Sequence, residues 1–122
     1  ALYEDSTEIP AAPVQKDIDD ADSFQIPLID RLYSVHFRPH EGETYQSFKK
    51  EMIQLIYSLP AGINELYFHP SIDTEEIRKI CSSWQRRVWE FELLFDPDFS
   101  YAIQDSGTRR ISYPMIRPEN RP

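Results

Sequence analysis

The clearest pattern in the chain is an apolar stripe at helical spacing between residues 44 and 59. Its members are Phe48, Met52, Leu55, Ile56 and Leu59, which fall on one face of a helix with 3.6 residues per turn. Thr44 stands where an N-cap is favoured, and Pro60 and Gly62 follow where the helix should end. The pattern predicts a helix that begins after Thr44 and ends near Leu59.

Short stretches of β-forming residues lie on both sides of this helix. Residues 32–37 and 65–68 are rich in aromatic and aliphatic side chains, which is typical of strands. Residues 24–29 are apolar but contain Pro27, which indicates an extended or edge segment. Residues 109–113 predict a last strand that ends at Pro114, with Arg109 and Arg110 facing solvent.

Further helices are predicted between residues 73 and 107. Asp73 and Glu76 have the spacing of a capping box, and a longer helix is expected to begin near Ser83. This longer helix would place Trp84, Val88, Phe91 and Phe95 on one side. Asp96 and Pro97 have the types favoured at the N-cap and the first helical position, and Gly107 is suited to a left-handed helix end.

The order of the predicted elements is strand, helix, strand, helices, strand. This order favours an α/β fold with short parallel strands joined by crossover helices. In such sheets ligands gather at the carboxyl ends of the strands. His69 directly follows the best-defined strand, and an imidazole can transfer protons near neutral pH. A lone histidine at a strand end is nevertheless more often structural than catalytic.

The charge of the chain is concentrated at its beginning. The formal net charge is −8, and residues 1–23 carry seven acidic side chains and one lysine. We expect these residues to be an acidic, proline-containing arm or linker, and residues 24–122 to be the α/β segment. The run Asp17–Asp20 could bind a hard cation, but such runs are more often solvated. An acidic chain without a basic patch is not expected to bind nucleic acid or an anionic membrane.

Other residues that carry chemistry are few. The single cysteine, Cys81, cannot form an internal disulfide and is expected to be a buried structural thiol. His36 and His40 are separated by Pro39, which excludes a regular metal-binding helix, and no established metal motif is present. Neither a signal peptide nor an apolar run of ~20 residues is visible, so we expect a cytoplasmic protein.

Residues 59–116 resemble the late part of the YdjC/ChbG-like carbohydrate deacetylases. The resemblance rests on several short motifs in the same order: Pro60–Pro70 with its Glu-Leu-Tyr-Phe-His-Pro ending, Asp73 with Glu76-Ile77-Arg78, Ser83-Trp84-Gln85-Arg86-Arg87, Asp96-Pro97-Asp98-Phe99, and Gly107 with Ile111-Ser112-Tyr113. No single motif is specific, but their combination in this order is. Residues 24–58 agree only loosely, and residues 1–23 do not contribute.

The resemblance implies an irregular (β/α) barrel that removes N-acetyl groups from chitooligosaccharide-like sugars with a divalent metal. The metal-binding aspartate and histidines of the family come from earlier segments, and this chain has no counterpart of them. The chain therefore resembles the C-terminal part of such an enzyme, a partial barrel that holds no metal of its own. We expect it to be inactive alone and to need the N-terminal remainder of the protein and an N-acetylated oligosaccharide as partners.

The late histidine of the family carries over onto His69, which we expect to be catalytic, as the acid that protonates the departing amine. Arg87 and Trp84 are the candidate substrate-binding residues. Arg87 could instead form a structural ion pair. Trp84 belongs to an aromatic group, with Trp89, Phe91, Phe95 and Phe99, that could be a sugar-stacking platform or, more often, core.

A different class of function is also open. The chain could be a free-standing, non-catalytic α/β module used for binding or assembly. A severed piece of a barrel exposes apolar faces, and large exposed apolar patches favour association. We therefore expect the isolated chain to self-associate.

Overall fold

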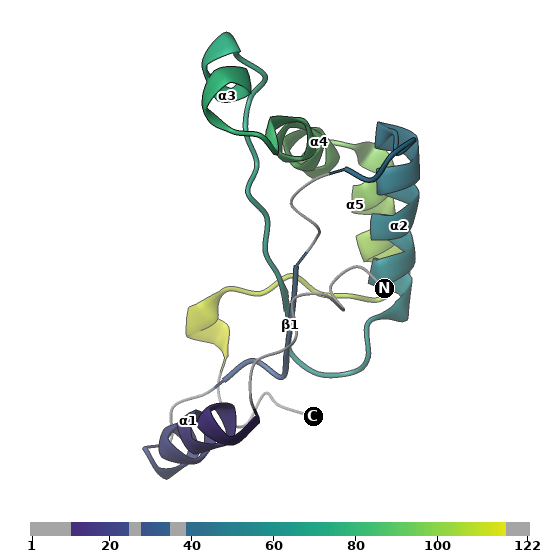
Figure 1. Cartoon of the computed structure of the whole chain (residues 1–122). Coiled ribbons are helices and arrows are strands. Elements are labelled where there is room, and N and C mark those ends of the chain that lie inside the picture. Colours follow the sequence, from purple (N-terminus) through teal and green to yellow (C-terminus); the bar gives the residue numbers. More distant parts are fainter. Residues whose placement is uncertain (1–10, 25–27, 35–38, 117–122) are drawn as a thin grey trace. The chain divides into compact units, whose positions relative to one another are not determined.

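The computed structural model describes residues 11–24, 28–34 and 39–116 of the chain. These ranges contain mostly helices and two short parallel strands (Figure 1). The elements are α1 (Ala11–Ser23), β1 (Arg31–Tyr33), α2 (Tyr45–Ser58), β2 (Asn64–Leu66), α3 (Glu75–Ile80), α4 (Trp84–Leu94), α5 (Pro97–Asp105) and the 3-10 helix η2 (Tyr113–Met115). The predicted α/β class with parallel strands is therefore confirmed, although two strands do not make a barrel.

The chain divides into two compact units. One unit comprises Ala1–Ser34, Pro60–Leu66 and Arg110–Pro122, and the other comprises Val35–Leu59 and Tyr67–Arg109. The first unit contains α1, the strands and η2, whereas the second contains α2 to α5.

The two strands of the first unit pair in parallel, with Leu32 opposite Glu65. The pairing begins at Asp30, whose backbone N–H donates to the carbonyl of Ile63 (2.7 Å). The Asp30 carboxylate accepts a hydrogen bond from the N–H of Ile63 (2.7 Å). Gly62, just before Ile63, has a φ of +125°, a backbone conformation that residues other than glycine rarely adopt. Both strands are shorter than predicted, and residues 35–37 of the expected first strand lie outside the described residues.

Residues 11–23, for which we expected an arm or linker, form α1. Pro13 is in the first turn, where its missing N–H leaves no hydrogen bond unmade. One turn later, Lys16 pairs with Asp20 at i,i+4 (2.7 Å), a spacing that supports a helix. Ala21 is buried.

The strand predicted at residues 109–113 is not formed. Residues 108–112 have no regular structure, and the chain turns at η2 instead, where the N–H of Ile116 donates to the carbonyl of Tyr113 (2.9 Å). Pro114 lies inside this turn and has no N–H to offer a strand neighbour. The hydroxyl of Tyr113 donates to the carboxylate of Glu65 on β2. Arg109 and Arg110 are exposed, as predicted.

The second unit is a small helical core in which α2 packs against α4 and α5 (Figure 1). Its buried apolar residues are Phe48, Met52 and Ile56 on α2, Val88, Trp89 and Leu93 on α4, and Phe99 and Ala102 on α5. The rings of Phe48 and Trp89 are stacked, with centroids 6.0 Å apart. The apolar stripe predicted for residues 44–59 is therefore the face that α2 buries.

Hydrogen bonds join α2 to α5 at both ends. Near their starts, the hydroxyl of Tyr45 donates to Asp96 (2.7 Å), which is also the N-cap of α5. Near their ends, the hydroxyl of Tyr57 donates to Asp105 (2.7 Å). The two helices therefore run side by side in the same direction. Thr44 caps α2 and Pro97 begins α5, both as predicted.

Two predicted features of the later helices are wrong. The N-cap of α3 is Thr74, whose side chain accepts from the N–H of Ile77 (3.2 Å). Asp73 instead forms an ion pair with Arg78. The face that α4 buries also differs from the predicted one, because Phe95 is 72% exposed. The buried residues of α4 are Arg86, Val88, Trp89, Glu90 and Leu93, so Val88 alone of the four predicted positions is buried.

Candidate functional site: the His69 segment on helix α4

His69 lies in an extended segment that is bonded to α4. Its backbone N–H donates to Oε2 of Glu90 (2.9 Å). Two residues later, the N–H of Ser71 donates to the backbone carbonyl of Arg87 (3.0 Å). Pro70, between them, has no N–H. The segment is thus attached to one helix on both sides of the His-Pro bond.

The strand before His69 ends earlier than predicted. β2 stops at Leu66, so His69 follows the strand by three residues and is not its terminal neighbour. His69 is half-buried, and its imidazole meets the ring of Tyr67 edge-on, with centroids 5.5 Å apart. An aromatic edge restricts the rotamers of the imidazole.

Glu90 holds the backbone of His69 from inside the helical core. Only 2% of Glu90 is exposed, and burial raises the pKa of its carboxyl group because the charged form loses its hydration. The hydrogen bond from the His69 backbone opposes this rise, as do the charges of His69, Arg86 and Arg87. Glu90 is therefore a buried acid surrounded by donors and cations.

Arg86, one turn before Glu90 on α4, is 1% exposed. Its Nη2 lies 3.0 Å from one carboxylate oxygen of Glu43 and donates to the other at 3.1 Å. The same carboxylate accepts from the backbone N–H of His40 (2.8 Å). The guanidinium lies over the ring of Phe48, 4.5 Å from its centroid. Among the described residues, its Nε and Nη1 have no hydrogen-bond acceptor, and the ring below provides a cation–π contact instead.

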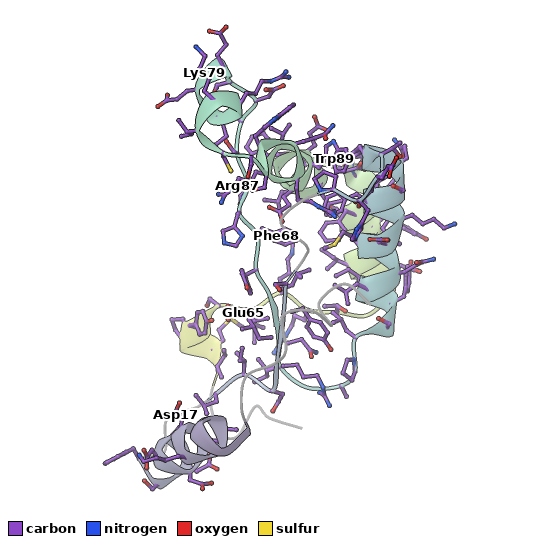
Figure 2. All side chains as sticks on the ribbon, in the orientation of Figure 1. Asp17, Glu65, Phe68, Lys79, Arg87 and Trp89 are labelled. Carbon is purple, nitrogen blue, oxygen red and sulfur yellow. The ribbon has the colours of Figure 1, made fainter. Side chains whose placement is uncertain are left out.

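Arg87, predicted to bind substrate or to form an ion pair, lies on the opposite side of α4 from Trp89 (Figure 2). It is half-buried, and its carbonyl fixes Ser71. Its positive charge and a hydrogen bond also lower the pKa of the Cys81 thiol, after the larger effect of the hydrogen bonds with Ser83. Arg87 is therefore close both to the His69 segment and to Cys81. Within the described ranges Arg87 forms no ion pair.

Trp84, the other candidate for substrate binding, is half-exposed at the start of α4. The guanidinium of Arg78 lies over its ring, 4.1 Å from the centroid. Arg78 is held there by two hydrogen bonds to Asp73, both 2.7 Å long. One face of the Trp84 ring is therefore occupied by an arginine of the same chain, and a sugar could stack only on the other face.

The aromatic group around Trp84 is divided between core and surface. Trp89 and Phe99 are buried, whereas Phe95 is 72% exposed and leans on the half-buried Phe91, with ring centroids 5.1 Å apart. Cys81, expected to be buried, is half-exposed at the end of α3.

In the part of the chain that the structure describes, no three His, Cys, Asp or Glu side chains are grouped so that they could hold a metal ion. His36, half of the weak histidine pair, lies outside the described residues. None of the described helices combines the length and the apolar character needed to cross a membrane.

Sequence reasoning proposed His69, Arg87 and Trp84 as site residues and did not single out Glu90, Arg86 and Glu43. A signal for two of these was present. Arg86 and Glu90 lie four residues apart among Val88, Trp89 and Leu93, so charged residues interrupt an otherwise apolar face at helical spacing. Comparison of the chain with models of known families, with curated proteins and with solved structures found no match.

Proposed function

We propose that this chain is the C-terminal part of a metal-dependent carbohydrate deacetylase and that His69 is its general acid. The observation that carries the proposal is the attachment of the His69 backbone to buried Glu90 (2.9 Å) in a residue that remains partly exposed. A proton donor must be held within a fraction of an ångström of its productive position and must still reach the substrate. The backbone bond supports the first requirement and the partial exposure of His69 supports the second.

The reaction class comes from the resemblance of residues 59–116, and the partial barrel is proposed on the same basis. Hydrolysis of an acetamide leaves an amine that must be protonated as the C–N bond breaks. In this proposal the imidazolium of His69 gives its proton to that nitrogen. The described residues do not offer a metal site, so we assign no step on the metal to them.

Arg87 is the proposed contact to the sugar. It lies beside the His69 segment, its carbonyl bonded to Ser71, and a guanidinium offers donors that suit hydroxyl groups. We assign Trp84 a smaller part, stacking with the ring face that Arg78 leaves open.

The experiment is a His69→Ala change in the longer protein that the proposal implies. Acetate release from an N-acetylated chitooligosaccharide is measured with added divalent metal, and bound metal is measured in parallel. We expect kcat to fall by about 10²- to 10⁴-fold, the usual contribution of a general acid, with metal content unchanged. His40→Ala is the matched control and should keep its activity. Full activity of His69→Ala would refute the role.

A second candidate, an assembly module, is favoured by one observation. The second unit exposes several large apolar side chains, namely Ile72 (63%), Ile80 (73%) and Phe95 (72%), and no residue of α3 is buried. Exposed apolar groups of this kind favour association. We propose on this basis that the isolated chain self-associates.

A further inference from the structure

The hydrogen bond between the His69 backbone and Glu90 raises a question of chemistry. A buried N–H needs an acceptor, but a neutral side chain would satisfy it at lower cost than a carboxylate that is only 2% exposed. The chain nevertheless places a glutamate there. It also surrounds the carboxylate with the positive charges of Arg86 and Arg87 and with His69 itself.

Arg86 and Glu90 are one turn apart on the buried face of α4, a spacing that makes them neighbours. Arg86 is in turn paired with Glu43, at 3.0 Å. Charges therefore alternate in sign from Glu43 through Arg86 to Glu90, and the last of them meets the backbone of His69. A buried charged group is tolerable when it is paired and hydrogen-bonded. Glu43 and Arg86 meet this condition through each other, and Glu90 is hydrogen-bonded to the His69 backbone and stabilised by the charge of Arg86.

The second bond of the segment restricts the same short stretch of backbone. Ser71 donates to the carbonyl of Arg87 (3.0 Å), and Pro70 has a φ fixed by its ring. The backbone on both sides of Pro70 is thereby tied to α4. The hydrogen bond to Glu90 fixes the backbone of His69, whose side chain is proposed to transfer the proton. The hydrogen bond from Ser71 fixes the backbone two residues later.

We propose that Glu90 is a positioning residue for His69, its buried carboxylate fixing the backbone that presents the imidazole. The expected effect on catalysis rests on the proposed function. The fixing of the His69 backbone by Glu90 rests on geometry alone. A misplacement of about 1 Å can lower a rate by about 10²-fold. Loss of the acceptor should therefore lower kcat far more than it changes KM.

The structural half is tested on the chain itself by NMR. The amide proton of His69 is followed during an acid titration, because an N–H bonded to a carboxylate shifts upfield when that carboxylate becomes protonated. We expect a titration whose midpoint is above the usual glutamate value, since burial raises the pKa of Glu90. Protonation of the imidazole also shifts this amide, so the titration is repeated in His69→Ala, where Glu90→Gln should abolish it. A residue-69 amide that does not titrate in His69→Ala would overturn the inference.

The catalytic half compares two substitutions in the longer protein. Glu90→Gln keeps an oxygen that can accept the same N–H, so kcat should stay within about threefold of the unmodified value. Glu90→Leu removes the acceptor, and kcat should fall by at least tenfold with KM nearly unchanged. The matched control is Glu92→Gln, at an exposed position of the same helix, which should have no effect.

The two proposals fail in different ways. Suppose that the unmodified protein is active and His69→Ala is inactive. A folded and fully active Glu90→Leu variant would then overturn the positioning role only. If the unmodified protein is active and His69→Ala keeps full activity, the proposed function is overturned. The NMR titration then still decides whether Glu90 holds the backbone. Circular dichroism establishes whether Glu90→Leu folds. If it does not, the amide titration and Glu90→Gln decide the inference.

Discussion

Arg86 offers the sharpest test of how the helical unit is held together. Arg86→Met keeps most of the aliphatic stem and removes the charge. Glu43 would then lose its cation, and its side chain is only 6% exposed. Removal of one partner from a buried ion pair costs about 3–5 kcal/mol, because the other charge stays buried without compensation. The cation–π contact with Phe48, at 4.5 Å, would be lost as well.

We therefore expect Arg86→Met to lower the free energy of unfolding by about 3–5 kcal/mol. That is a large fraction of the roughly 5–15 kcal/mol that stabilises a typical domain. Urea unfolding of the chain, followed by far-ultraviolet circular dichroism and tryptophan fluorescence, measures it. Trp89 is a suitable probe because it stacks on Phe48 within the same core.

Arg78 is the matched control within the same chain. It too has a carboxylate partner, Asp73 (2.7 Å), and an aromatic ring, Trp84 (4.1 Å). Its side chain, however, is 52% exposed, so water replaces what the substitution removes. Arg78→Met should barely move the urea midpoint.

A double-mutant cycle isolates the interaction between Arg86 and Glu43 from the other effects of replacing Arg86. Glu43→Gln in the Arg86→Met background removes the charge that the first change left uncompensated, so part of the lost stability should return. We expect a coupling free energy of about 0.5–3 kcal/mol. A loss below about 1 kcal/mol in Arg86→Met, or one equal to that of Arg78→Met, would refute the reasoning that burial makes this pair matter.

Two further outcomes are expected. Gly62→Ala should destabilise the strand pair by about 1–3 kcal/mol, since its Cβ would lie 2.9 Å from Oδ2 of Asp30 at a φ of +125°. The control is Gly42→Ala, which has nothing within 4 Å of the new atom and so measures the backbone effect alone. Equal losses of stability in the two variants would contradict the role of Asp30. Self-association of the chain should appear in sedimentation velocity and should weaken in Phe95→Ser, because this ring is 72% exposed. A chain that stays monomeric at high concentration would contradict it.

Helices whose signals are local could be predicted from sequence. The start of α2 depends on Thr44, which accepts from the N–H of Ser47 (3.1 Å), and the start of α5 depends on Asp96 and Pro97. These residues act within one turn of the chain, so no knowledge of the tertiary structure is needed to interpret them.

The buried face of α4 could not be predicted from hydrophobicity. An apolar pattern places Phe95 inside, whereas the structure exposes it and buries Arg86 and Glu90. Which face of α4 is buried depends on partners in other segments. Arg86 pairs with Glu43, and Glu90 accepts from the His69 backbone. Such partners lie 43 and 21 residues away in sequence, beyond the reach of a helical period.

Strands were the least predictable elements for the same reason. Residues 109–113 have β-forming character, but a strand needs a neighbour, and Pro114 places a turn there instead. β1 and β2 depend on contacts such as that between Asp30 and Ile63, which are 33 residues apart. Local propensity indicates a strand only where such a contact also exists.

The candidate site combines both kinds of information. His69 could be found because a motif surrounds it, but its placement depends on one backbone N–H that turns toward the interior of a helical core. An apolar residue at position 90 would leave that N–H buried without an acceptor, at a cost of about 1–3 kcal/mol. Glu90 satisfies it, and the resulting negative charge makes a cation one turn away favourable. Arg86 supplies that cation, and Glu43 balances Arg86 in turn. The bond from the His69 backbone to Glu90 and the Arg86–Glu43 pair thus hold three charged residues that no hydrophobic pattern would place in a core.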